Sequence, residues 1–530
     1  MHSIFEIGGP ENIENVIIEF KDRHPGSQVN RTDTATLLKT ALQYFMLFFT
    51  SIILKTFIEA TNAFGRYTTP GNRWKDLEVK EFQTFIGIML HLGVVKYPRR
   101  ELAWSKGKYG SPWVRSMMLQ SRFEQILKCW HWVDTSKLSQ RERAEKNKAN
   151  SFWTVQTFLD QLADNFLKWY NPHQKANVDE GCFGFKIKHR ARCYNPKKPW
   201  KWHFKAFCLN CSVTGYLINF FMYQGKDEKR PPGQTATEYP VLRLLSNIKF
   251  HHINMILATD NWYTSIMLAI KLLEWGIYLF GTSRVNKQGS PKKAIFKKSG
   301  ADKKERGDIN CERTQVKVDG FHYWLYFISW MDNKPVHFIS TFFSKYSQVM
   351  RVVKEGRRYG RHQLIRIPTL AMIYNSCMGG TDSFDQLLSF YRTTIKTKRW
   401  QTRIFTHFLM CAVVNAHILY KLGGGVEMKE GGLKRGDHGY DLLDFITILI
   451  DQLVSPFKPS ATKKQEDTED FIRFTGVHEP LYCNNFYESD RRIDNRRSCV
   501  CCRKRVRTFC NDCKVPLCFK GYWKTWHTAP

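Results

Sequence analysis

Four aspartates lie where separated segments of the chain could supply carboxylates to one site: Asp179, Asp260, Asp382 and Asp385. The first two lie at the ends of expected strands, and the last two share one face of an expected helix at a three-residue spacing. Hydrolysis of a phosphodiester by two metal ions needs carboxylates that hold the ions about 3.5–4 Å apart. Oxygen ligands of this kind favour Mg²⁺ or Mn²⁺. The pattern indicates divalent-metal chemistry on phosphate esters.

Each aspartate also has an ordinary interpretation. Asp382 follows Gly379-Gly380 at an expected helix start, where an aspartate is a favoured cap and where Ser383 with Gln386 would also form a capping box. Asp179 and Asp260 could be solvated carboxylates in loops. Because the chain has 48 acidic residues, many arbitrary triples exist, and position alone does not select this set.

The charge balance favours a polyanionic partner. The 530-residue chain has 81 Lys and Arg against 48 Asp and Glu, a formal net charge of +33. Phosphate neutralisation and counterion release make nucleic acid the leading candidate, with a merely soluble basic protein or an anionic membrane surface as alternatives. The longest apolar run near the start, 44–54, is shorter than the roughly 20 residues that cross a bilayer, so we expect no membrane partner.

Two stretches without acidic residues, 181–226 and 386–426, adjoin the proposed carboxylates. Cations there would offset the repulsion between phosphates and carboxylates, although solvated basic faces would have the same composition. The expected DNA contacts are Lys186, Lys188, Arg190, Lys197, Lys198 and Lys201 in the first stretch, and Arg392, Lys396, Lys398 and Arg399 in the second. Trp200 and Trp202 are interleaved with the first set.

The end of the chain is rich in cysteine. Two Cys-x2-Cys pairs followed by a further cysteine and a histidine are typical of zinc sites. The expected Zn²⁺ ligands are Cys499, Cys502, Cys510, Cys513, Cys518 and His527. A module this small depends on its metal to fold. The neighbouring cations Arg503, Lys504 and Arg505 suit contacts with phosphates.

Periodicity divides the chain into a helical part and an α/β part. Apolar residues at three-to-four spacing predict helices from about 36 to 170. Strands are expected at 183–188, 203–208, 216–223, 254–258 and 277–282, with helices at 239–248 and 265–274 between them. This order is compatible with an RNase H-like core. Further strands are expected at 323–329 and 336–341, followed by helices from about 382 to 391 and from 399 to 421.

Three motifs occur in order along the chain. They are Val178-Asp179-Glu180 with Tyr194-Asn195-Pro196-Lys197-Lys198-Pro199, then Thr259-Asp260-Asn261-Trp262-Tyr263-Thr264-Ser265, and Met378-Gly379-Gly380-Thr381-Asp382-Ser383-Phe384-Asp385-Gln386 closed by Lys398-Arg399-Trp400. In these motifs, and over about residues 35–530, the sequence resembles the piggyBac family of DNA transposases. The resemblance implies that Asp179, Asp260 and Asp382 are catalytic metal ligands and that Asp385 is an accessory carboxylate.

The resemblance also implies an activity and partners. A nuclear cut-and-paste transposase of this type binds double-stranded transposon ends as a homodimer, cleaves them through hairpin intermediates and inserts at TTAA targets. The alternative is a domesticated DNA-binding protein without transposition activity. Tyr522 stands where relatives commonly have a further cysteine, which leaves open whether one or two zinc ions bind.

The expected domains follow from the same resemblance. They are an N-terminal tail at 1–30, a helical dimerisation and DNA-binding domain at 31–173 and 392–457, an RNase H-like catalytic core at 174–285 and 369–391, an insertion domain at 286–368, a linker at 458–496 and a cysteine-rich zinc domain at 497–530.

Overall fold

The structure is a computed structural model. The residues it describes are 25–28, 38, 40–69, 74–135, 138–226, 228–297, 304–342, 348–354, 362–393, 395–423 and 441–454, with short strands at 480–482, 497–498, 505–506 and 508–510. The chain divides into two compact units, Met1–Lys458 and Pro459–Pro530. The domain boundaries expected inside the first unit stay predictions.

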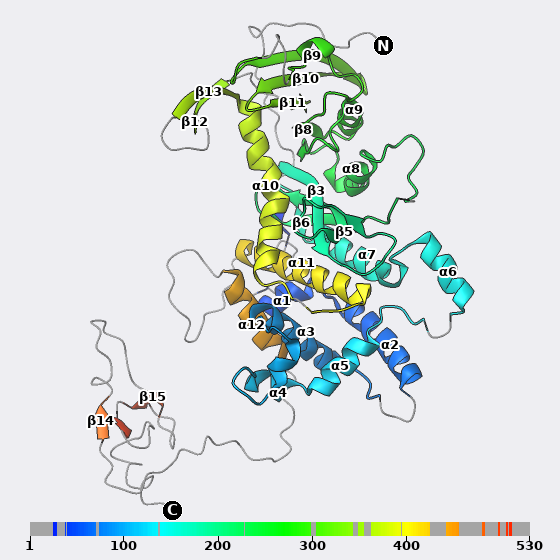
Figure 1. Ribbon diagram of the computed structural model, residues 1–530, viewed down its shortest axis with the longest axis vertical. Helices are drawn as coiled ribbons and strands as arrows, with labels where there is room; N and C mark the ends of the chain where they lie inside the picture. The colour runs from blue at the N-terminus through cyan, green and yellow to red at the C-terminus, as the bar shows by residue number, and fades with distance from the viewer. Residues whose placement is uncertain are drawn as a thin grey trace, which may run out of the picture. The chain divides into compact units, whose positions relative to one another are not determined.

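A nine-stranded mixed sheet lies at the centre of the first unit (Figure 1). Its strands are β3 (Lys175–Gly184), β4 (Cys193–Tyr194), β5 (Trp202–Cys211), β6 (Leu217–Met222), β7 (Ile256–Thr259), β8 (Tyr278–Thr282), β9 (Ile309–Val318), β10 (Phe321–Met331) and β11 (Pro335–Ser340). Their order is β4-β5-β3-β7-β8-β11-β10-β9, with β6 beside β5. Strands β3, β7 and β8 are parallel to one another, and the other pairings are antiparallel.

The residues between β8 and α10 extend this sheet. Strands β10 and β11 cover the expected strands at 323–329 and 336–341, and β9, which the sequence did not predict, pairs along the whole of β10. A smaller hairpin, β12 (Gln348–Lys354) with β13 (His362–Pro368), follows. Strand β9 was not predicted because two of its buried positions are the polar residues Glu312 and Thr314.

Helices cover the sheet and build the opposite end of the unit (Figure 1). They are α1 (Ala41–Met46), α2 (Ser51–Thr68), α3 (Val79–Val94), α4 (Pro112–Met117), α5 (Gln120–Cys129), α6 (Gln140–Ala149), α7 (Trp153–Lys168), α8 (Tyr239–Leu244), α9 (Ile266–Glu274), α10 (Thr369–Phe390), α11 (Trp400–Leu422) and α12 (Leu442–Val454), with 3-10 turns at Arg100–Trp104, Ile248–Phe250 and Lys292–Ala294. The helical pattern expected from 36 to 170 is therefore confirmed.

Helix α11 connects the helical part to the sheet. By length and composition it could cross a membrane, but 94% of its most apolar window is buried inside the protein, as in the core helix of a folded unit. Phe405 packs against Trp130 with ring centroids 4.4 Å apart. The Asn415 amide hydrogen-bonds both backbone groups of Leu217 in β6, at 3.0 and 2.9 Å. A buried amide satisfied in this way fixes the helix against the sheet.

Helix α10 corrects one prediction. It begins at Thr369, so Asp382 lies in its middle, and the expected cap and capping box at this position are wrong. Gly380 permits close packing of the helix against the sheet instead of starting the helix. A Cβ at Gly380 would lie 2.3 Å from Asn177 Oδ1 and 3.0 Å from the Cys211 carbonyl oxygen. Figure 1 shows α10 running from β13 past β3 towards α11.

The described parts of the second unit are short strand pairs. Strand β14 (Pro480–Tyr482) pairs with β17 (Thr508–Cys510), and β15 (Arg497–Ser498) pairs with β16 (Arg505–Val506). In the first unit, a similar short pair joins β1 (Gly26–Ser27) to β2 (Tyr170–Asn171). The expected zinc ligands Cys499, Cys502, Cys513, Cys518 and His527 lie outside the described residues, as do Arg503 and Lys504. For Cys510 and Arg505 the strand backbone alone is described.

Candidate active site

The parallel pairing of β3 with β7 places two of the aspartates side by side. Val178 pairs with Thr259, and the next residue along each strand is Asp179 and Asp260. Neighbouring strands lie about 4.8 Å apart. Asp179 Oδ1 accepts the Glu180 N–H at 2.8 Å, and Asp260 Oδ1 accepts the Trp262 N–H at 2.9 Å. These local hydrogen bonds orient the Asp179 carboxylate on β3 and the Asp260 carboxylate directly after the end of β7.

Both carboxylates of this pair are partly buried, and their pKa values are raised. Burial raises the pKa of Asp179 to about 7. The hydrogen bond from the Glu180 N–H lowers this pKa, and the charge of Asp260 raises it further. Burial also raises the pKa of Asp260 against the opposing hydrogen bonds from the Trp262 and Tyr263 N–H groups. Two desolvated carboxylates in proximity are unfavourable without a cation.

Helix α10 brings the other two aspartates to the sheet. The Asn177 Nδ2 group on β3 donates to Thr381 Oγ1 at 2.8 Å, and this hydroxyl donates to Asn210 Oδ1 on β5 at 3.0 Å. Burial raises the pKa of Asp385 to about 6; the positive charge of Arg392 lowers it and the charge of Asp382 raises it further. Asp382 itself is exposed.

Lys198 interacts electrostatically with one carboxylate of each pair. Burial lowers the pKa of its ammonium group, but Cys182 and the carboxylates of Glu180, Asp179 and Asp385 raise it by more, so the net shift is upward. Its charge also lowers the pKa of both Asp179 and Asp385. Lys198, predicted as a DNA contact, is therefore placed where it interacts with the proposed metal ligands.

The ion pair between Lys205 and Glu180 was not predicted from the sequence. The Lys205 ammonium lies 3.0 Å from Glu180 Oε1 and 4.6, 4.8 and 5.2 Å from the ring centroids of Phe207, Tyr223 and Trp262. This lysine links the residue after Asp179 to the loop after Asp260. The signal was present, because Glu180 and Trp262 both belong to the ordered motifs, but their spacing does not reveal a shared cation.

The four aspartates do not form one complete ligand set. Within the part of the chain that the structure describes, no three His, Cys, Asp or Glu side chains lie close enough to hold one metal ion. The structure brings Asp179 to Asp260 and Asp385 to Asp382. The Asp179–Asp260 pair fits a hard divalent cation by its oxygen donors and by the raised pKa values that such a cation would lower.

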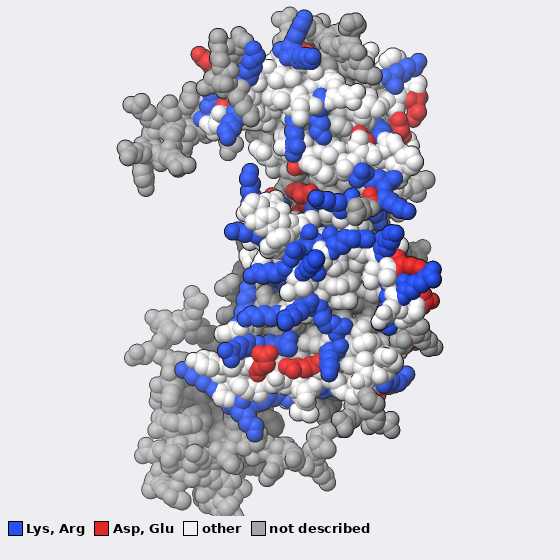
Figure 2. Space-filling model, turned by 45° about the vertical axis from the view of Figure 1, so that its right-hand side comes forward, with Lys and Arg blue, Asp and Glu red and all other residues white. Residues whose placement is uncertain are grey.

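The predicted DNA contacts of the first stretch, apart from Lys198, lie on the surface of the protein. Lys186, Lys188, Arg190, Lys197 and Lys201 are exposed, and Arg190 Nη1 donates to the Lys148 carbonyl at 3.1 Å. Figure 2 shows Lys and Arg side chains gathered over one face of the first unit, with few acidic side chains between them. A face of this composition suits a phosphate backbone.

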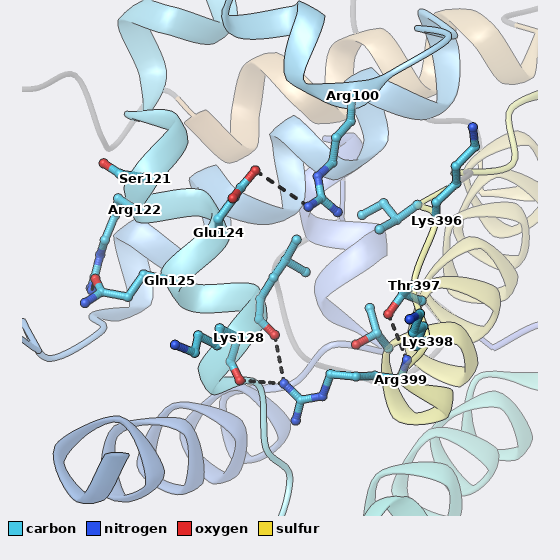
Figure 3. Close-up of a pocket in the computed structure, with 13 residues that line it drawn as sticks. Arg100, Ser121, Arg122, Glu124, Gln125, Lys128, Lys396, Thr397, Lys398 and Arg399 are labelled. Carbon is cyan, nitrogen blue, oxygen red and sulfur yellow. Dashed lines mark hydrogen bonds and ion pairs between the residues drawn. The ribbon is translucent and has the colours of Figure 1, made fainter. Parts of the chain in front are cut away.

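The second stretch lines an open pocket of about 740 Å³ between α5 and the residues that precede α11 (Figure 3). Lys396 and Lys398 are exposed at this pocket, whereas Arg392 is partly buried and lies near Asp385. The Arg399 guanidinium donates to the carbonyls of Leu127, Lys128 and Trp130 at 3.0, 2.5 and 2.9 Å. Arg399 therefore fixes the end of α5, and its DNA contact stays a prediction.

Comparisons with known proteins agree with this architecture. A family model described as Transposase IS4 matches residues 40–417. The human "PiggyBac transposable element-derived protein 3" is 24% identical over 404 residues, which cover 73% of this chain and 62% of the relative. The human "PiggyBac transposable element-derived protein 5" is 26% identical over 408 residues, covering 74% of this chain and 72% of the relative.

A solved structure shares the fold. The cryo-EM structure of a piggyBac transposase synaptic complex with hairpin DNA superposes with a TM-score of 0.68 at 23% identity, covering 94% of this chain and 98% of that chain. The match confirms a mixed α/β fold with a central sheet. Since the chain spans 62% of the length of the first relative, the activity and partners of that whole protein are not carried over by similarity.

Proposed function

This chain belongs to the piggyBac-type family of transposases, and we propose on that premise that it is a cut-and-paste DNA transposase. The reaction would comprise metal-dependent hydrolysis at transposon ends, transesterification through hairpin ends and insertion at TTAA. The observation that carries the proposal is the Asp179–Asp260 pair where β7 ends beside the parallel strand β3, with raised pKa values on both carboxylates.

The sheet order supports an RNase H-like core. Strands β6-β5-β3 form an antiparallel meander, and β7 and β8 continue from β3 in parallel. Such a core would gather carboxylates from its first strand, from the end of the strand that lies parallel beside it and from a later helix. We assign Asp179 on β3, Asp260 after β7 and the α10 pair Asp382 and Asp385 to these three positions.

Asp179 and Asp260 would hold Mg²⁺ or Mn²⁺, with Asp382 and Asp385 completing the set when DNA is bound. The cation would supply positive charge to the attacking and leaving oxygens of the phosphodiester. Lys198 offsets the negative charge of Asp179 and Asp385, which eases the approach of a phosphate. The Lys205–Glu180 ion pair would offset the negative charge that Glu180 adds beside Asp179 and Asp260.

The remaining parts of the proposal concern the binding partners of the protein and its location in the cell. Double-stranded transposon ends would lie on the basic face, the active form would be a homodimer, and the cysteine-rich segment would bind Zn²⁺ and read the ends. A DNA substrate of this kind implies the nucleus. The second candidate is a domesticated DNA-binding protein without transposition, which is favoured by the names of the human relatives as element-derived proteins.

The experiment is cleavage of a plasmid that carries the genomic DNA from both sides of the coding sequence. We expect Mg²⁺-dependent strand breaks with the unaltered protein and none with Asp260→Asn. Asp164→Asn, an exposed aspartate on α7, is the matched control and should cleave normally. Duplex binding should be the same for both variants, and neither should unfold at a lower temperature than the unaltered protein.

The outcomes separate the candidates. Normal cleavage by Asp260→Asn would refute the assignment of the site. DNA binding by the unaltered protein without any cleavage, with Mg²⁺ or Mn²⁺ present, would favour the domesticated candidate.

A further inference from the structure

The β4–β5 hairpin presents three exposed aromatic side chains. Tyr194, Trp200 and Trp202 are 55%, 44% and 39% exposed, although residues of this size usually bury most of their surface. Tyr194 pairs directly with Trp202 across the hairpin. Trp200 lies two residues after Lys198, whose ammonium interacts with Asp179 and Asp385.

The two tryptophans are not equivalent. The Trp202 ring has the Arg192 guanidinium 3.8 Å from its centroid and the Tyr194 ring at 4.5 Å, so neighbours of its own hairpin cover it. The Trp200 ring rests on the backbone of β3, because a Cβ added at Gly184 would lie 2.7 Å from Trp200 Cε3.

The position of Trp200 is also fixed through its backbone. The His203 ring donates from Nδ1 to the Trp200 carbonyl at 2.8 Å. A ring that is supported on one side by backbone and exposed on the other loses little conformational freedom when a flat ligand stacks on it.

The charge around Trp200 selects the kind of flat ligand. Lys197 and Lys201 are exposed on either side of it, and the sequence from 181 to 226 contains no acidic residue. Cations next to an exposed aromatic ring are the combination that binds single-stranded nucleic acid, through phosphates and bases respectively.

We propose that Trp200 stacks on an unpaired base of DNA at the carboxylate site, with Lys197 and Lys201 on the adjoining phosphates. The inference rests on the proposed DNA-processing function and adds a residue that selects opened DNA over closed duplex. Bases inside a duplex are already stacked, so this contact forms only where strands are separated or a terminus is unpaired.

The test uses two DNA probes of the same sequence. One is a fully paired duplex, and the other carries an internal loop of unpaired bases that includes 2-aminopurine. Binding is measured without metal in the Asp260→Asn background, so that no probe is cut. We expect tighter binding of the looped probe and quenching of 2-aminopurine by the stacked indole.

Replacement of the indole should remove this preference. Trp200→Ala should weaken binding of the looped probe by roughly 10- to 100-fold, the range for loss of one base–aromatic stack, with no change for the duplex. Trp200→Phe should restore most of the preference. Phe321→Ala, which removes a ring that is 69% exposed on β10, is the matched control and should behave like the parent.

Three results would overturn the inference. These are equal affinity of Trp200→Ala and its parent for the looped probe, an equal loss for both probes, and a lowered melting temperature of Trp200→Phe as well as Trp200→Ala. Failure of the parent to bind either probe would instead refute the proposed function itself.

Discussion

Replacing Gly380 by alanine adds one methyl group at the contact between α10 and β3, and replacing its neighbour Gly379 adds the same group elsewhere. A Cβ at Gly379 meets no described atom within 4 Å. A Cβ at Gly380 would lie 2.3 Å from Asn177 Oδ1, where ordinary contacts begin at 3.4 Å. The two substitutions are therefore matched in helix propensity and differ in packing.

The expected magnitudes follow from these distances. In a helix interior, alanine is favoured over glycine by about 1 kcal/mol, so Gly379→Ala should stabilise the protein slightly. Gly380→Ala must move the helix or the Asn177 amide by about 1 Å, and overpacking of this kind costs about 1–3 kcal/mol. The free energies of unfolding of the two variants should differ by that amount. A displacement of about 1 Å at Asp382 and Asp385 should also reduce cleavage about 100-fold.

The assay is urea unfolding followed by single-turnover cleavage of a DNA substrate that the unaltered protein cuts. Gly380→Ala should unfold at lower urea and cleave slowly, whereas Gly379→Ala should match or exceed the parent in both. Cleavage at the parent rate by Gly380→Ala, with stability equal to that of Gly379→Ala, would refute the idea that this close approach positions the α10 carboxylates.

Two further predictions concern charge. The metal-free protein should lose stability as pH rises from about 4 to about 7, because the pKa of Asp179 in the folded state, about 7, exceeds its unfolded value near 3.9. Mg²⁺ should restore stability at pH 7. In urea unfolding, Asp179→Asn should make the free energy of unfolding depend less on pH. An unchanged pH dependence would contradict the raised pKa assigned to Asp179. Arg399→Lys should lower the free energy of unfolding by about 1–3 kcal/mol, because lysine cannot reach the three carbonyls that Arg399 joins. Duplex affinity should stay unchanged in Arg399→Lys and fall in Lys398→Ala, whose stability should equal that of the parent; the reverse pattern would assign the DNA contact to Arg399.

Local pattern was sufficient for most elements of the sheet. The apolar runs that predict strands at 254–258 and 277–282 correspond to β7 and β8 within a few residues. Strand β7 lies between two parallel neighbours, and β8 lies between a parallel and an antiparallel one. Both are almost fully buried, so their sequences are continuous apolar segments. The order of elements followed directly from such runs.

Features that depend on residues distant in the chain could not be predicted from the sequence. Gly379-Gly380 resembles a helix boundary, because the sequence does not show that Asn177 lies against the second glycine. Strand β3 begins at Lys175, earlier than the expected strand at 183–188, because the buried Asn177 breaks its apolar pattern. In the sequence Arg399 is one more cation of a basic stretch, because its partners, the carbonyls at the end of α5, are distant in the chain.

The Asn177–Thr381 hydrogen bond joins residues 204 positions apart in the chain. Contacts of such long separation form late in folding, since a large loop must close before they give any stabilisation. A partly synthesised chain can therefore pair β3 with β7, and so bring Asp179 beside Asp260, long before α10 has been made. The α10 carboxylates join the other two last. The full set of four acidic side chains would therefore assemble only after nearly the whole first unit has been made and folded.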